Sequence, residues 1–227
     1  MTRTIVTQIK PRDAVPSVSY TVQFPNDPND WNWIFRNPLE RGKGSNVKFT
    51  GLCIISGGQT GADRAGLDIA NLMGISTGGW AAIDYMTSEG QDLSLKDLGL
   101  VPIATGPGAG YADRTRKNVE LADATLIFAF DRSSAGTRLT INHCSNIKQP
   151  YYVVDLGKDD LATKPQQVVA WLKSQFAGVD LEAPPEGPPF VLNIAGNREV
   201  AGTTKVYDAT AAFVSAILRY WSTWEES

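Results

Sequence analysis

The ten residues Leu52–Gly61, with the sequence LCIISGGQTG, constrain the fold of this chain more than any other segment. An apolar run typical of a buried strand stops at Gly57 and Gly58, and an amphipathic helical pattern begins at Ala62. A strand, a glycine turn and a helix N-terminus in succession bring backbone amides toward a ligand, and such junctions bind anions. The segment therefore predicts an α/β fold with a site for a phosphate-like or nucleotide-like ligand.

Strand-like and helical patterns alternate through most of the chain after residue 51. We expect strands at 52–56, 75–77, 124–130, 151–156 and 190–194, and helices at 62–73, 113–122, 136–147, 164–176 and 206–221. Residues 78–110 are glycine-rich, and we expect a long irregular loop there with a helical patch near 93–98. The alternation predicts a Rossmann-like, doubly wound and mostly parallel sheet with helices on both faces.

Residues 1–50 have a different character, because they are polar and repeatedly interrupted by proline. We expect an irregular N-terminal arm there and a single nucleotide- or cofactor-binding domain over 51–227. The arm contains Trp31, Trp33 and Phe35, and the last predicted helix ends in an aromatic stretch around Trp221. Large apolar side chains gathered at both ends of the chain predict a homo-oligomer.

Composition and charge exclude several classes of function. The formal net charge is -3 and no run of lysine and arginine stands out, so a nucleic-acid partner is not expected. No apolar stretch approaches the roughly 20 residues of a membrane span, and the N-terminus lacks the core of a secretory signal, which predicts a cytoplasmic protein without a membrane partner. With His143 as the single histidine and Cys53 and Cys144 far apart, we expect no metal site, no catalytic triad and reduced, buried cysteines.

In a doubly wound sheet the ligand lies beyond the carboxyl ends of the strands, which selects four loops. In the first loop, Thr60 and Asp63 have the spacing of a helix-capping pair, and Arg64 is placed to reach an anion or to pair with Asp63. In the second, Arg114 and Asn118 share one helix face. These side chains predict an anion site built from the first two loops.

The third loop, 131–137, repeats the pattern of a strand, small residues and a helix start, and it predicts a second anion site. Ser134 or Thr137 alternatively serves as a simple helix cap there. The fourth loop, 193–199, is a weak signal by itself. Trp80 and Tyr85, from the expected long loop, are candidates to cover or stack on the ring of a ligand.

With these loops in place, the chain resembles the molybdenum (cofactor) carrier family, within the Rossmann-like superfamily of DprA-type proteins and LOG-type phosphoribohydrolases. The resemblance rests on ISGGQTGADRAGLDIA (55–70), GGW (78–80), YADRTRKNVELADATLIF (111–128), SAGTRLT (134–140), PYYVVDL (150–156) and LNIAGNRE (192–199). It implies an oligomer that holds a molybdopterin-type cofactor or another phosphate-bearing ligand at its glycine loops.

The loops and the resemblance together select thirteen candidate ligand-binding residues. They are Gly57, Gly58, Gln59, Thr60, Gly61, Arg64, Tyr111, Arg114, Asn118, Ser134, Gly136, Thr137 and Thr140. LOG-type hydrolases carry a catalytic glutamate where this chain has Thr140, which disfavours hydrolysis, and no catalytic residue is assigned. A non-catalytic binding or carrier protein is therefore the leading hypothesis.

Two other functions fit the same loops. A sensor or sponge of a nucleotide second messenger would use the same anion sites without turnover. A nucleotide or N-glycosidic hydrolase would need one of the acids near the predicted cleft, which are Asp63, Asp84, Glu89 and Asp92.

Overall fold

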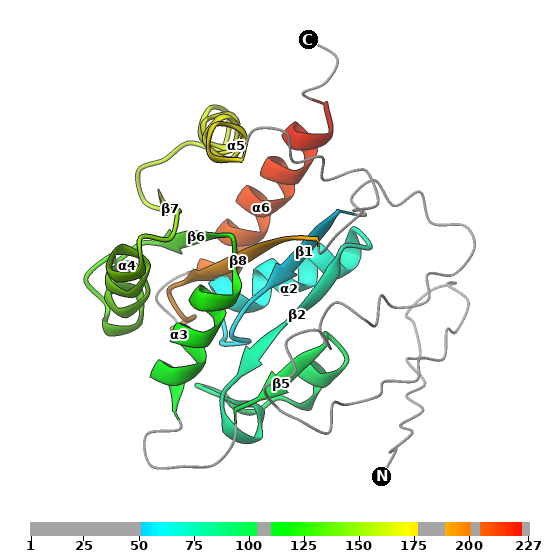
Figure 1. The fold of residues 1–227 in the computed structure, drawn as a ribbon, viewed down its shortest axis with the longest axis vertical. Coiled ribbons are helices and arrows are strands. Elements are labelled where there is room, and N and C mark those ends of the chain that lie inside the picture. Colours follow the sequence, from blue (N-terminus) through cyan, green and yellow to red (C-terminus); the bar gives the residue numbers. More distant parts are fainter. Residues whose placement is uncertain (1–50, 104–109, 177–188, 201–204, 224–227) are drawn as a thin grey trace. The chain divides into compact units, whose positions relative to one another are not determined.

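The computed structural model describes residues 51–103, 110–176, 189–200 and 205–223 (Figure 1). The described residues all belong to one compact unit, which spans Val47–Ser227. The predicted arm over 1–50, with Trp31, Trp33 and Phe35, lies outside the described residues. None of the helices within the described ranges is both long and apolar enough to cross a membrane.

Six strands form one parallel sheet in the order β5-β2-β1-β8-β6-β7 (Figure 1). They are β1 (Leu52–Ile55), β2 (Ser76–Ala81), β5 (Leu100–Pro102), β6 (Ala124–Ala129), β7 (Tyr151–Asp155) and β8 (Phe190–Gly196). Cys53 of β1 is in register with Ser76 on one side and with Val191 on the other. The parallel, doubly wound sheet predicted from the alternating pattern is therefore confirmed.

The last strand along the chain, β8, lies at the centre of the sheet between β1 and β6. In an ordinary doubly wound sheet the central position belongs to the first strand, and later strands are added outward on either side. If the β8–α6 unit is counted first, the spatial order becomes 4-3-2-1-5-6, which is of this ordinary kind. The sheet is thus a doubly wound sheet whose central strand comes last in sequence, a feature that the alternating pattern could not reveal.

The helices cover the two faces of the sheet. Their bounds are α2 (Ala62–Leu72), α3 (Tyr111–Leu121), α4 (Ala135–Ile147), α5 (Lys164–Gln175) and α6 (Val206–Thr223). Side chains of α2, α5 and α6 share one apolar core with Leu192 and Ile194 of β8. Since side chains alternate along a strand, Asn193 faces the other side, where it lines a cavity with residues of α3 and α4.

Trp221, near the end of α6, is buried in this apolar core. The predicted helix over 206–221 is confirmed, but the ring of Trp221 packs against residues of its own chain and is not exposed for contact with a second subunit. Trp221 therefore gives no support to the expected homo-oligomer, which stays a prediction.

The region 78–110 is far more regular than the expected long loop. Strand β2 continues to Ala81, and η1 (Ile83–Tyr85), the hairpin β3 (Met86–Thr87) and β4 (Gly90–Gln91), η2 (Leu93–Lys96) and β5 follow. Gly78 and Gly79 made β2 hard to predict, because glycine is uncommon inside strands. The structure shows why glycine is needed at position 79. A Cβ at Gly79, where φ is +119°, would lie 2.5 Å from the carbonyl oxygen of Ser56, so β1 could not come as close.

Trp80 and Tyr85 do not cover a ligand. Trp80 is 4% exposed and Tyr85 is 5% exposed, and Tyr85 packs in a small apolar cluster with Leu95 and Leu100. The ring of Trp80 is also covered by the ammonium group of Lys117, 4.2 Å from its centroid. The expectation that these two rings stack on a ligand is wrong because both are part of the packing of the domain.

Candidate functional site

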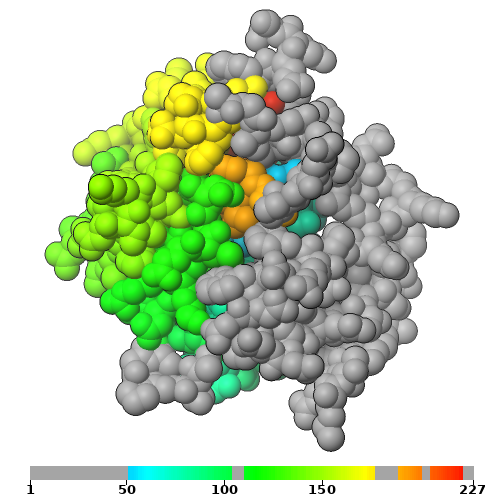
Figure 2. All heavy atoms as spheres, viewed as in Figure 1, coloured from blue at the N-terminus to red at the C-terminus, as the bar shows by residue number. Residues whose placement is uncertain are grey.

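A small cavity of about 40 Å³ opens at the carboxyl end of the central strands, which is the edge predicted for a ligand. It is lined by Gly57, Asp63, Arg114, Thr115, Asn118, Gly136, Thr140, Asn193, Ala195 and Gly196. In Figure 2, atoms of β8 (orange) reach the surface beside atoms of the green segment that includes α3. Five of the thirteen predicted residues line the cavity: Gly57, Arg114, Asn118, Gly136 and Thr140.

Arg114 is the cation of this cavity. It is only 8% exposed, and its Nη1 donates to the Oδ2 atom of Asp63 at 2.5 Å. The guanidinium lies directly against Gly57, where any side chain would overlap it. The Nε–H of Arg114 is buried and has no acceptor among the described residues. A cation with a spare donor therefore lines the cavity, and a buried donor without a partner is costly unless a ligand or water satisfies it.

Asp63 belongs to this pair rather than to a helix cap. The Oδ2 atom of this 5%-exposed residue also accepts from the backbone amide of Gln59 at 3.2 Å. Helix α2 begins after Gly61 without a side-chain cap, so the capping pair expected from Thr60 and Asp63 does not form. Asp63 also does not pair with Arg64. Its Oδ1 atom accepts no hydrogen bond from the described part of the chain.

At the β1–α2 junction, residues 56–61, the amides of Ser56, Gln59 and Thr60 donate to protein atoms, whereas those of Gly57, Gly58 and Gly61 have no acceptor among the described residues. The amide of Thr60 donates to Oε1 of Gln59, and the amides of Ala62 and Arg64 donate to the carbonyl oxygens of Asn197 and Gln59. The glycines make room for protein atoms as well. A Cβ at Gly61 would lie 2.6 Å from the carbonyl oxygen of Asn197, and one at Gly58 would lie 2.6 Å from Leu95. The protein itself therefore fills the space at Gly58 and Gly61, and we call this junction closed, although Gly57 lines the cavity.

The side chains of Gln59 and Thr60 are held by the tip of the β3–β4 hairpin. Ser88 donates its amide to Oε1 of Gln59 at 2.8 Å, and its hydroxyl bonds to that of Thr60 at 2.8 Å. These contacts are exposed to solvent. The two residues, predicted from sequence to hold a ligand, thus bind a neighbouring loop, and neither lines the cavity.

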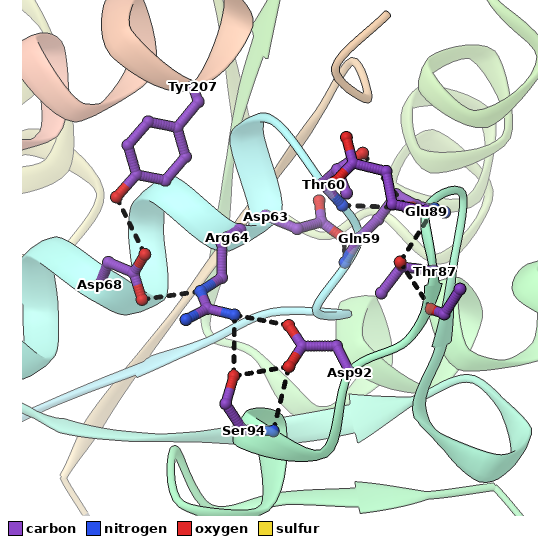
Figure 3. Close-up of polar contacts among 11 residues, drawn as sticks. Gln59, Thr60, Asp63, Arg64, Asp68, Thr87, Glu89, Asp92, Ser94 and Tyr207 are labelled. Carbon is purple, nitrogen blue, oxygen red and sulfur yellow. Dashed lines mark hydrogen bonds and ion pairs between the residues drawn. The ribbon is translucent and has the colours of Figure 1, made fainter. Parts of the chain in front are cut away.

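Arg64 does not line the cavity and belongs to a network of its own (Figure 3). Its Nε donates to Asp68 at 2.8 Å, and its Nη1 donates to Asp92 at 2.5 Å and to Ser94 at 3.0 Å. The hydroxyl of Tyr207 completes the network by donating to Asp68 at 2.9 Å, and burial raises the pKa of Tyr207 to about 12. Two carboxylates neutralise Arg64, so it is a structural residue that ties α2 to η2.

The β6–α4 junction, residues 130–137, is the open counterpart of the β1–α2 junction. Ser134 is the N-cap residue of α4, but its hydroxyl donates to that of Thr137 instead of accepting from the helix. Within the described ranges, the backbone amides of Ala135, Gly136 and Thr137 have no acceptor. A Cβ at Gly136 would meet nothing within 4 Å. These free amides, at the positive end of the helix dipole, are suited to an anion.

Asn197 connects the two junctions, and sequence reasoning missed it. Its Nδ2 donates to the Thr137 hydroxyl and to the Asp131 carbonyl at 2.9 Å each, and its Oδ1 accepts from the Asp131 amide at 2.8 Å. Its own carbonyl oxygen accepts from the amide of Ala62 at 3.0 Å. The signal in the sequence was the glycine before it, because a Cβ at Gly196 would overlap the carbonyl oxygen of Phe128.

The remaining predicted residues have structural partners. Asn118 binds both backbone groups of Trp80, at 2.7 and 2.9 Å, and so fastens α3 to β2 while it lines the cavity. Thr140 donates to the carbonyl oxygen of Gly136 at 3.1 Å. Tyr111 is 47% exposed and does not line the cavity. Its role as a ligand contact stays a prediction.

Residues with metal-binding or nucleophilic chemistry lie apart from each other. Cys53 and Cys144 are free and buried, as predicted, and burial raises the pKa of the Cys53 thiol to about 12 and that of Cys144 to about 11. His143 pairs with Glu120 at 2.8 Å. In the described part of the chain, no three His, Cys, Asp or Glu side chains come together as a metal ion would require.

Comparison with known proteins places this architecture in a family. A crystal structure from Syntrophus aciditrophicus SB, named a "putative molybdenum carrier protein", superimposes with a TM-score of 0.62 and 32% sequence identity. The match covers 76% of this chain and 96% of that one. No match was found among functionally curated proteins.

A family model described as the circularly permutated YpsA SLOG family matches residues 54–218. The central β8, which comes last in the chain and first in an ordinary winding order, agrees with that description. By fold, by the extent of the match and by the position of β8, the chain belongs to the circularly permutated YpsA SLOG family.

Proposed function

We propose that this protein binds the phosphate group of a small cofactor or nucleotide-like ligand and serves as its carrier. The observation that carries the proposal is the open start of α4, whose Gly136 lines a cavity together with Arg114, a cation whose buried Nε–H has no acceptor among the described residues. Amides at a helix N-terminus and an arginine are the groups that hold phosphate most often. The phosphate would lie against Gly136, Arg114 and Gly57.

A molybdopterin-type cofactor is a ligand consistent with this site. The structural neighbour is named a molybdenum carrier, and the donors of the cavity fit the phosphate end of such a cofactor. A cavity of about 40 Å³ admits a group of that size, so the rings would lie outside it. When bound, the cofactor would supply the metal chemistry, and Arg114 and the α4 amides would only hold and orient its phosphate.

Carriage is a better account of the site than hydrolysis. Thr140, which stands where related hydrolases have an acid, donates its hydroxyl to the carbonyl oxygen of Gly136 and has no acid–base chemistry near neutral pH. The acid that does line the cavity, Asp63, is fixed by Arg114 and by the amide of Gln59. We also propose that the carrier works in the cytoplasm as a homo-oligomer.

Native mass spectrometry of the freshly purified protein tests the proposal. We expect a phosphate-bearing small molecule that is lost in Arg114→Gln and retained in Arg116→Gln. Arg116 is a matched control because it lies on the same helix, half-exposed, and pairs with Asp113 at 3.0 Å. Failure of wild-type protein to retain, or to be thermally stabilised by, any pterin phosphate or nucleotide would overturn the proposal. Release of a free base from a bound nucleotide would replace carriage with hydrolysis.

A further inference from the structure

The cavity contains one feature that a simple anion site would lack, which is a carboxylate. Its lining includes Gly136, in the first turn of α4 where the amides are free, and Arg114, whose buried Nε–H has no acceptor among the described residues. Asp63 lines the same cavity, and both of its hydrogen bonds use the Oδ2 atom. The Oδ1 atom therefore remains as an acceptor that no group in the described residues has taken.

A carboxylate beside an anion site changes which anions can bind. An ionised carboxylate only accepts hydrogen bonds, so it repels an oxyanion that has no proton to offer. An oxyanion that carries a proton can donate its O–H to the same oxygen and turn the repulsion into a short, charge-assisted hydrogen bond. A phosphate monoester, with a second pKa near 6, takes up or keeps such a proton close to neutral pH. Phosphodiesters, sulfate and molybdate are fully ionised there.

We propose that Asp63 is a specificity-determining residue that makes the site select a terminal phosphate monoester over phosphodiesters and fully ionised oxyanions. The inference rests on the proposed function and deepens it, because it states which class of phosphate the protein holds. The cargo carries its phosphate at one end, attached through a single ester oxygen. Free molybdate is not the cargo, since it has no proton to give to Oδ1.

The geometry keeps Asp63 in place for this role. Oδ2 is anchored by Nη1 of Arg114 at 2.5 Å and by the amide of Gln59 at 3.2 Å, which holds this oxygen in position. Arg114 is itself confined by its contact with Gly57. Two carboxamides line the cavity with Asp63: Asn118 is committed to Trp80 through both its oxygen and its nitrogen, and Asn193 donates to Thr125 at 3.3 Å. Both are uncharged, so neither repels a fully ionised oxyanion as a carboxylate does. Selection for a protonated oxyanion therefore falls to Asp63.

Calorimetric titration near neutral pH tests the proposal with five probes: inorganic phosphate, methyl phosphate, dimethyl phosphate, sulfate and molybdate. For the wild-type protein we expect phosphate and methyl phosphate to bind at least about tenfold more tightly than the other three, which corresponds to about 1.4 kcal/mol. Asp63→Asn preserves the shape and an acceptor for Gln59, but its amide can donate. We expect this variant to gain about tenfold for sulfate and molybdate and to lose the preference.

Asp113→Asn is the matched control, because Asp113 is also an acid paired with an arginine of α3 but does not line the cavity. We expect this variant to bind like the wild type. If no probe binds to the wild-type protein, the proposed function fails. If phosphate and sulfate bind the wild-type protein equally tightly, the proposed role of Asp63 is wrong, while the proposed phosphate site remains. This comparison uses the wild-type protein alone and does not depend on the folding of a variant. Persistence of the preference in a folded Asp63→Asn protein would also overturn it.

Discussion

At the β1–α2 junction the amides of Gln59, Thr60 and Ala62 donate to oxygen atoms of the protein, whereas at the β6–α4 junction the amides of Ala135 and Gly136 donate to none of the described residues. In sequence the first junction, with its doubled glycine, is the stronger candidate for an anion site. In the structure it is the second that is open. A glycine turn before a helix therefore predicts an anion site only where no other loop of the protein has used its donors.

The difference comes from the loops that lie against each junction. The β8–α6 loop covers Gly61, and the β3–β4 hairpin binds Gln59 through Ser88. At the other junction Asn197 binds the side chains of Ser134 and Thr137 and both backbone groups of Asp131, and it leaves the amides of the first turn of α4 free. Gly57 of the closed junction lies against the guanidinium of Arg114, and the open junction has free backbone amides. Residues of both junctions line the same cavity.

The largest expected effect comes from adding one methyl group to the closed junction. In Gly61→Ala the new Cβ would lie 2.6 Å from the Asn197 carbonyl and the Glu199 amide, at a backbone φ of +84°. We expect the free energy of unfolding to fall by about 3 kcal/mol, because both the contact and the left-handed backbone are unfavourable for alanine. Urea denaturation monitored by circular dichroism measures it.

The matched control is the same substitution in the open junction. Gly136→Ala has nothing within 4 Å of the new Cβ and lies in the first turn of α4. We expect it to stabilise the protein by about 0.5 kcal/mol, because alanine favours the helix more than glycine does. Similar losses of stability in both variants would mean that the two junctions are not open and closed in the sense described.

The next largest effect is expected from a substitution that caps the free amides of the open junction and so lowers ligand affinity. Ser134→Asp places a carboxylate at the N-cap of α4, where it can accept from the free amides. We expect the affinity for methyl phosphate to fall about tenfold while the free energy of unfolding rises by about 0.5 kcal/mol, because the carboxylate caps the helix and competes with the ligand. Calorimetry and urea denaturation measure the two. Unchanged affinity would move the phosphate away from this helix.

A smaller effect is expected beside the closed junction. Arg64→Gln removes an arginine that is about one-third exposed and bound to Asp68 and Asp92. We expect a loss of up to about 1 kcal/mol in stability, as for other partly exposed ion pairs, and no change in affinity for methyl phosphate. Titration of both proteins with methyl phosphate checks this. A clear loss of affinity would restore Arg64 to the ligand site, where the sequence had placed it.

The smallest effect is the response of stability to alkaline pH. The pKa of Cys53 is raised from 9.0 to about 12 in the folded protein, so the unfolded chain loses this proton first and binds fewer protons above pH 8. Stability therefore falls with rising pH, by about 0.4 kcal/mol from this thiol between pH 8 and 9. Urea denaturation at the two pH values measures it, with Cys53→Ala as the reference that lacks this contribution. An equal fall in the variant would assign the effect to other groups.

Local patterns sufficed for most of the fold, and long-range geometry was needed for the site. Apolar runs such as ATLIFA (124–129) are buried on both faces, so their strand character is written in adjacent residues. Arg114 was found because it shares one helix face with Asn118, and Gly136 because it lies at a helix start after a recognisable strand. Asp63, by contrast, reaches Arg114 from 51 positions away, and no local pattern states which arginine an acid will meet. The central position of β8 could not be predicted from the sequence either, because the segment FVLNIAG indicates a strand but not its place in the sheet.

The position of β8 has a consequence for synthesis on the ribosome. Every other strand leaves the exit tunnel before it, so the nascent chain first holds β5-β2-β1 and β6-β7 as separate groups whose inner edges, on β1 and β6, are unpaired. The unpaired backbone donors and acceptors of each group can pair with other chains until β8 binds between β1 and β6. The protein therefore completes its central hydrogen bonds, and with them the cavity that β8 helps to line, only after β8 has left the tunnel.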